Sequence, residues 1–172
     1  ASRFEARLDA DGHAVSLQDQ ARSKWDLELI QRGLAYLEEA SQDPDHLRNE
    51  YLIQAAISAV HCQAPRYDDT DWKSILSLYD LQLQQSPSPI IELNRVIALE
   101  KIHGPLLGLK EVERLEATQF FEGYYLFYAI KSEMLQKMGH DEEAKAALET
   151  AITLTQNEIE KAYLESKLEG LE

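Results

Sequence analysis

Apolar residues recur every three or four positions along most of the chain, which is the period of amphipathic α-helices. This pattern predicts helices over residues 18–40, 50–62, 71–83, 90–102, 106–115, 120–138, 141–155 and 158–171. Proline or glycine stands in most of the gaps, as expected at helix ends. The segment IIELNRVIALEKI (90–102) is apolar on almost every side, which predicts a centrally buried helix.

The first residues follow a different pattern. RFEARLDADGHAVSL (3–17) alternates around an Asp-Gly pair, which predicts a short β-hairpin or an extended segment. We therefore divide the chain into an N-terminal hairpin or linker (1–18) and a helical domain (19–172). Because the chain opens with Ala1 and begins in the middle of this pattern, we expect it to be a piece of a longer protein.

The breaks between the predicted helices are periodic. The intervals from Thr70 to Gly104 and from Gly104 to Gly139 are 34 and 35 residues. This is the period of the tetratricopeptide repeat, a helix-turn-helix unit. The predicted fold class is therefore all-α, an α-solenoid of tetratricopeptide-like helix pairs with a concave inner face.

One copy of the repeat is well preserved, YAIKSEMLQKMGHDEEAKAALETAITLTQ (128–156). It has an aromatic residue at Tyr128, small residues at Ser132, Ala144 and Ala151, and Gly139 between its two helices. Small side chains allow two helices to approach closely, so this copy predicts a closely packed helix pair. The upstream copies are degenerate.

The acidic stretch RYDDTDWKSILSLYD (66–80) allows three interpretations, a metal site, a catalytic acid pair or a helix start. A calcium loop spreads its oxygen ligands over about twelve residues, whereas these aspartates are consecutive or nearly so. Asp69 or Thr70 is suited to cap a helix, and Asp71 then lies in the first turn, where the helix dipole favours a negative charge. We favour helix capping.

Composition narrows the function classes. The 172 residues are 44% hydrophobic and 28% charged, which indicates a globular domain, and no apolar run reaches the length of a membrane span. A single cysteine excludes an internal disulfide framework and favours a cytoplasmic protein. The net charge of −14 repels phosphate backbones, so we do not expect this segment to bind nucleic acid directly.

The sequence carries no recognisable enzyme motif: it lacks a phosphate-binding glycine loop, a nucleophile elbow and a zinc-protease helix. His61 and Cys62 are adjacent on a predicted helix and point about 100° apart, so they do not form a nucleophile–base pair. We expect Cys62 to be a buried apolar residue, and His61 to line a groove or serve packing. We therefore predict no enzymatic activity, no metal and no cofactor.

Three polar side chains have two interpretations. Arg22, Asn94 and Arg95 belong either to a structural network that joins helices or to a contact with an anion or a peptide terminus. Asp69, Asp71 and Glu92 are their candidate partners, and we favour the network. Tyr124, Tyr125, Phe127 and Tyr128 are either core residues or a binding platform, and we favour the core.

A family resemblance is carried by three stretches: LDADGHAVSLQDQARSKWDLELIQRGL, LIQAAISAVH and DDTDWKSILSLYDLQLQQSPSPIIELNRVIALEKIHGPLLGL. They resemble the C-terminal extension of a subgroup of extracytoplasmic-function (ECF) sigma factors of bacterial RNA polymerase. Residues 19–26, 69–72 and 87–95 are the most specific parts. Ala21 and residues 48–50 depart from the family pattern.

The resemblance implies a tetratricopeptide-like domain that regulates a parent protein active in promoter-specific transcription initiation. The parent would bind promoter DNA through N-terminal sigma regions outside this chain. The implied partners of this domain are those regions, core RNA polymerase or a regulatory protein. Weaker alternatives are a small-molecule sensor and a generic peptide-binding module. The candidate interaction or network residues are Arg22, Trp25, His61, Asp69, Asp71, Trp72, Asn94 and Arg95.

Overall fold

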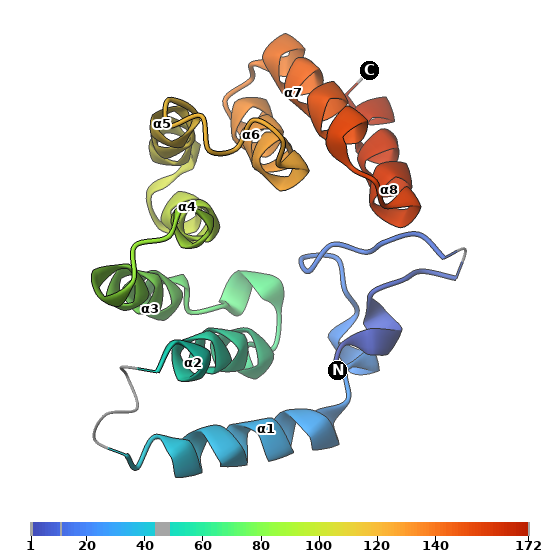
Figure 1. Cartoon of the computed structure of the whole chain (residues 1–172). Helices are drawn as coiled ribbons and strands as arrows, with labels where there is room; N and C mark the ends of the chain where they lie inside the picture. Colours follow the sequence, from blue (N-terminus) through green and yellow to red (C-terminus); the bar gives the residue numbers. More distant parts are fainter. Residues whose placement is uncertain (1, 11, 44–48, 172) are drawn as a thin grey trace. The chain divides into compact units, whose positions relative to one another are not determined.

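The computed structural model of the chain describes residues 2–10, 12–43 and 49–171 (Figure 1). In that part the fold is all-helical and contains no β-strand. No helix of the described residues is both long and apolar enough to cross a lipid bilayer. The α-helices are α1 (Leu27–Ala40), α2 (Glu50–Gln63), α3 (Trp72–Gln85), α4 (Pro89–His103), α5 (Pro105–Glu116), α6 (Tyr125–Lys137), α7 (Asp141–Leu154) and α8 (Glu158–Glu169).

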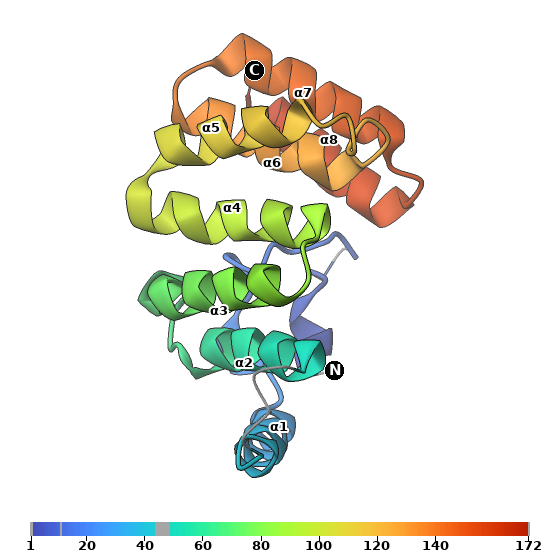
Figure 2. The ribbon, with the colours of Figure 1, turned by 60° about the vertical axis from the view of Figure 1, so that its left-hand side comes forward.

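The helices belong to two compact units. The first comprises the described residues of 1–11 and 15–91, and the second those of 12–14 and 92–172. In the first unit α2 lies between α1 and α3, and in the second α6 lies between α5 and α7, while α7 also contacts α8 (Figures 1 and 2). Each of these helices packs against its neighbours in sequence, which is the arrangement of an α-helical repeat protein.

The best-preserved repeat forms a closely packed helix pair, α6 and α7, as predicted. Ser132, Ala144 and Ala151 are buried between helices, and the Ser132 hydroxyl donates to the Ala144 carbonyl at 2.7 Å. Gly139 has a φ of +75°, which favours glycine. The Gly139 and His140 N–H groups donate to the Gln136 and Leu135 carbonyls, the pattern of a Schellman motif that ends a helix.

The N-terminal segment differs from its prediction. The described part of residues 3–17 forms no β-hairpin; Phe4–Ala6 is a 3-10 turn, and the Val15 N–H donates to the Arg7 carbonyl at 2.8 Å. Asp11, half of the predicted Asp-Gly turn, lies outside the described residues. Turns and an isolated backbone bridge, without a strand, stand where the hairpin was predicted; an isolated two-stranded hairpin is at best marginally stable in water.

The first α-helix begins later than predicted, at Leu27 instead of Gln18. The Asp26 carboxylate accepts from the Leu29 N–H at 2.9 Å and caps the helix, while residues 22–24 form a separate 3-10 turn. Apolar spacing alone did not detect this cap. Likewise, α6 begins at Tyr125 instead of Phe120. Phe121 lies in a turn before the helix, where its ring stacks on that of Phe127 at 5.0 Å.

The acidic stretch starts a helix, but the capping residue differs from our prediction. Asp71, not Asp69 or Thr70, is the N-cap of α3: its carboxylate accepts from the Ser74 N–H at 3.1 Å and from the Ser74 hydroxyl at 2.6 Å. The preceding residues, Tyr67–Asp69, form a 3-10 turn. This turn sets the cap one or two residues later than the local pattern indicated. Among the described residues, no group of three or more His, Cys, Asp or Glu is placed to hold a metal ion.

Candidate functional site

Four of the predicted residues meet in the first unit. Arg22 begins the 3-10 turn that precedes α1, and Trp25 directly follows that turn. His61 lies in the last turn of α2, and Trp72 is the first residue of α3. Arg3 joins them from the N-terminal segment. We refer to Arg3, Arg22, Trp25, His61 and Trp72 as the Arg–Trp cluster.

Trp25 is the buried centre of this cluster. Its side chain is only 5% exposed. The guanidinium carbon of Arg22 lies 4.5 Å from the centre of its ring, and that of Arg3 lies 5.7 Å away. Both distances fall within the range of cation–π attraction, which is stronger where water is excluded. Two cations of an acidic chain are thus held against one indole.

Arg22 also ties the N-terminal segment to the end of α2. Its Nη1 donates to the carbonyl of His61 at 2.5 Å and to that of Ala64 at 2.7 Å. The last carbonyl groups of a helix have no partners within the helix, and a cation at that end also interacts favourably with the helix dipole. The structural-network interpretation of Arg22 is therefore supported by two direct contacts.

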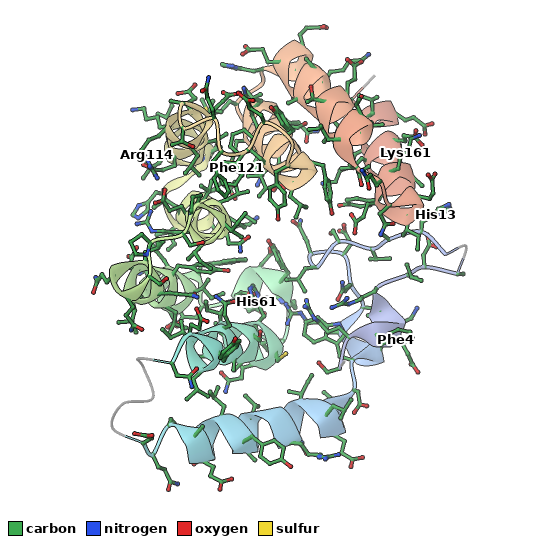
Figure 3. All side chains as sticks on the ribbon, viewed as in Figure 1. Phe4, His13, His61, Arg114, Phe121 and Lys161 are labelled. Carbon is green, nitrogen blue, oxygen red and sulfur yellow. The ribbon has the colours of Figure 1, made fainter. Side chains whose placement is uncertain are left out.

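His61 is held in an aromatic and cationic environment. Its ring packs edge-on against Trp72 at 5.3 Å, and Trp72 packs in the same way against Tyr67. Figure 3 shows His61 between α2 and the turn Tyr67–Asp69. Burial, and then the charges of Arg3 and Arg22, lower the pKa of His61 to about 4. The imidazole is therefore neutral at pH 7.

Several polar atoms around the cluster are buried without a hydrogen-bond partner among the described residues. They are Arg22 Nη2, Trp25 Nε1, His61 Nδ1 and Thr70 Oγ1. Thr70, like Trp25, is almost fully buried, with 6% of its surface exposed. Gln20 Oε1, an acceptor in the same unit, is also buried without a partner. Buried polar atoms are rarely left unpaired, so this group is unusual.

The two predicted aspartates have local structural roles. Asp69 accepts two hydrogen bonds from the guanidinium of Arg66, at 2.8 and 2.9 Å, which lower the pKa of its carboxyl group. Asp71 caps α3. Both are exposed, and each carboxylate is engaged within its own turn.

Asn94 and Arg95 lie in α4, on residues that belong to the second unit, and both are half-buried. Glu92, which we considered as their partner, accepts from Arg114 of α5 at 2.6 Å. The Arg95 side chain also interacts with another group of the chain, so it is not left without a partner.

The aromatic residues near α6 are mostly packed. Phe127 is buried, and Tyr125 and Tyr128 lie against the core formed by Leu148, Ala151 and Leu164. This packing favours the core interpretation over a binding platform. Cys62 is only half-buried, so our prediction of a buried thiol was too strong.

Sequence reasoning missed Arg3 and Thr70. Arg3 was placed in a strand that does not form, and Thr70 was considered only as a helix cap. A usable signal did exist: Arg3 and Arg22 are basic residues in a strongly acidic chain, and Arg22 is three residues from a tryptophan. Only the fold shows that both guanidinium groups share that ring.

Fold and site together define an all-α helical-repeat protein whose first unit contains the Arg–Trp cluster around the buried Trp25. Residues 1–41 match a protein family described as "Family of unknown function (DUF6596)", a range that includes Arg3, Arg22, Trp25 and α1. Over 171 residues the chain is 38% identical to "Uncharacterized protein R00370" of Rhizobium meliloti (strain 1021). The alignment covers 99% of this chain but 39% of that relative, so the chain spans about two fifths of its length. No solved structure matches the chain at a significant level.

Proposed function

We propose that this chain is a regulatory protein-interaction domain of a bacterial ECF sigma factor, whose parent protein acts in promoter-specific transcription initiation. The resemblance of residues 19–26, 69–72 and 87–95 to that family supports the proposal. So does the match of residues 1–41 to a domain that occurs in sigma-factor-related proteins. The similar protein of Rhizobium meliloti is much longer than this chain, as expected for a parent with additional domains.

The observation that carries the proposal is the apolar surface of α1. No residue of this helix, which lies wholly within the described part of the chain, is fully buried. Leu29, Gly33 and Tyr36 are exposed at positions i, i+4 and i+7, so they lie on one face. Tyr36 is 65% exposed. We call these three residues the α1 stripe; tyrosine is enriched at protein interfaces because its ring is apolar and its tip polar.

The α1 stripe would dock on the sigma regions of the parent or on core RNA polymerase, with a separate regulatory protein as a further candidate. The net charge of −14 favours a basic partner surface and disfavours promoter DNA. The proposed domain acts in the cytoplasm, where RNA polymerase works, and has no catalytic role of its own.

The test is promoter-specific transcription by the full parent with core polymerase. The variant carries Leu29→Ser and Tyr36→Ser, which remove the apolar surface without adding charge. Its matched control is Ile159→Ser, since Ile159 is an exposed apolar residue of α8, outside residues 1–41. We expect the double variant to change transcription by at least about tenfold, because losing one central interface side chain weakens binding by about that factor or more. The control should leave transcription unchanged.

A version of the parent truncated before Arg3 gives the sign of the effect. Loss of transcription would make the domain an activating part of the initiation machinery, and a gain would make it an inhibitory one. Circular dichroism checks that each variant folds. If the double variant, the control and the truncated protein all transcribe like the parent, the regulatory role is wrong.

A small-molecule sensor is the second candidate. It is favoured by one observation, the group of buried polar atoms without partners around Arg22 and Trp25. Saturable stabilisation by a small ligand, without any protein partner, would distinguish this role from docking.

A further inference from the structure

Gly33 lies in the middle of α1, and no neighbouring group of the chain accounts for a glycine there. The residue is exposed, and a Cβ atom added to it would meet nothing within 4 Å. Glycine is the poorest helix former after proline, so it weakens the helix that contains it. A glycine at this position is therefore a disadvantage to the chain alone, unless another backbone has to approach it closely.

Gly108 shows in the same chain what a glycine within a helix can do. It belongs to α5, and a Cβ atom there would lie 2.8 Å from Met134 Sδ and 3.1 Å from Glu100 Cβ. The missing side chain allows α4 and α6, which carry these two residues, to approach α5 closely. Gly33 offers the same close approach, but it offers it on the exposed side of α1.

The side chains on either side of Gly33 form a notch. Leu29 lies one turn before it and Tyr36 nearly one turn after it, on the same face of α1. These two side chains are 38% and 65% exposed. α1 packs mainly against α2 (Figure 2), and its half-buried residues Leu34 and Leu37 lie outside the notch. The notch therefore has the shape that receives a ridge of side chains from another helix.

The charges around the notch favour a basic helix. Residues 26–43 contain one cation, Arg32, and five carboxylates. The five carboxylates belong to Asp26, Glu28, Glu38, Glu39 and Asp43. The segment has a net charge of −4, one minus five. Two copies of this segment would repel each other, whereas a helix with lysine or arginine beside its apolar face would be attracted.

One helix face is small for an interface between two separate proteins. The whole of α1 has 14 residues, whereas a stable interface takes roughly 20–30 residues from each protein. Within one polypeptide, the effective concentration of a linked partner reaches roughly the millimolar range, so a weaker contact suffices. The alignment covers 39% of the similar Rhizobium meliloti protein, so a protein of that kind has ample length for such a helix.

We propose that an amphipathic α-helix of the parent protein, outside this chain, covers α1 and crosses it at Gly33. The apolar face of that helix packs against Leu29 and Tyr36, and lysine or arginine residues beside it pair with the carboxylates of α1. Its backbone comes close at Gly33, where no side chain holds it away. This inference names the partner of the α1 stripe, so it rests on the docking role proposed above.

The test is amide hydrogen exchange of α1, followed by mass spectrometry in the full parent and in the 172-residue chain alone. A docked helix suppresses the local opening of α1, so its exchange should be at least about tenfold slower in the parent. We expect this slowing without core polymerase and at every protein concentration.

Two variants place the same side chain on different faces of α1. Gly33→Met fills the notch, and Ala35→Met is the matched control, because Ala35 is exposed and points about 160° away from Gly33. We expect Gly33→Met to reduce the protection of α1 in the parent at least about fivefold, because overfilling a close contact is costly. Ala35→Met should leave the protection unchanged. Methionine is a better helix former than glycine, so a loss in Gly33→Met cannot come from a weaker helix.

Four results would overturn the proposal. Equal exchange in the parent and in the chain alone would mean that no helix covers α1. Slowing that appears only after core polymerase is added would assign α1 to the polymerase, and slowing that grows with protein concentration would assign it to a second copy. Equal protection in Gly33→Met and Ala35→Met would place the contact away from Gly33.

The transcription test with Leu29→Ser and Tyr36→Ser gives a separate answer. A protected α1 with unchanged transcription would keep the docked helix and refute its regulatory role. Changed transcription with an unprotected α1 would support the regulatory role and refute the docked helix.

Discussion

At the scale of single residues, Arg22 combines roles that sequence reasoning kept apart. It stacks on Trp25 and binds two carbonyl groups at the end of α2. Its Nη2, which carries two of the five N–H donors of the guanidinium, is buried without a hydrogen-bond partner among the described residues. A structural network and an anion contact are therefore compatible at this residue, because a guanidinium offers donors on several edges.

His61 provides a residue-scale prediction of pH dependence. Its pKa is about 4 in the folded chain, against an ordinary value of 6.5. Between pH 4 and pH 6.5 His61 is protonated in the unfolded chain but neutral in the folded one. The free energy of unfolding therefore falls as the pH drops through this window, and above pH 6.5 this loss disappears. Since His61 is partly exposed, we expect a loss of about 1 kcal/mol between pH 7 and pH 5.

The measurement is urea unfolding at pH 7, 6 and 5 for the unmodified 172-residue chain and for its variant His61→Gln, whose glutamine does not titrate. The variant should show a shallower loss over the same range. Asp71, whose pKa is lowered first by its hydrogen bonds with Ser74, loses its contribution only at lower pH. Equal slopes for both proteins would show that His61 is not kept neutral by the fold.

At the scale of helices, two glycines provide a matched pair. Gly108 of α5 is buried, and a Cβ atom there would lie 2.8 Å from Met134 Sδ and 3.1 Å from Glu100 Cβ. Gly33 of α1 is exposed, and a Cβ atom there would meet nothing within 4 Å. The same substitution should therefore have opposite effects in the two helices.

We expect Gly108→Ala to destabilise the fold by about 1–3 kcal/mol, because α5 approaches α4 and α6 too closely to admit a methyl group. Gly33→Ala should stabilise it by roughly 0.5–1 kcal/mol, because alanine is the better helix former. Chemical denaturation of the two variants checks both signs. A neutral or stabilising Gly108→Ala would mean that Met134 and Glu100 move aside easily.

At the scale of the whole molecule, the dominant electrostatic feature is the net charge of −14. Repulsion between like charges destabilises a compact state. Salt weakens this repulsion, and at 0.1 M it largely screens exposed charges that are more than roughly 10 Å apart. Attractive pairs such as Arg114–Glu92 are partly exposed and contribute little each. Repulsion should therefore outweigh attraction.

We expect the thermal midpoint at pH 7 to rise by roughly 2–4 °C between 20 and 300 mM salt, the scale of a change near 1 kcal/mol in a chain of this size. Sodium chloride and tetramethylammonium chloride should have the same effect if screening is the cause. A midpoint that falls with either salt would indicate that the ion pairs dominate.

The sequence by itself determined the helical content and the repeat. The period of apolar residues and the spacing of Thr70, Gly104 and Gly139 are local properties, and the ends of α5 and α6 follow from Pro105 and Gly139. The small residues of α6 and α7 also predicted their close packing. These features rest on backbone preferences and side-chain size, which are properties of short segments.

Only the tertiary structure decided where α1 begins, which aspartate caps α3 and what surrounds Trp25. Capping depends on the backbone conformation of the preceding turn, which Tyr67–Asp69 sets for α3. The Arg–Trp cluster joins Arg3, Arg22, His61 and Trp72 across a span of 69 residues, 72 minus 3. The positions of such distant residues depend on how whole helices pack, and no periodicity within a segment encodes that packing.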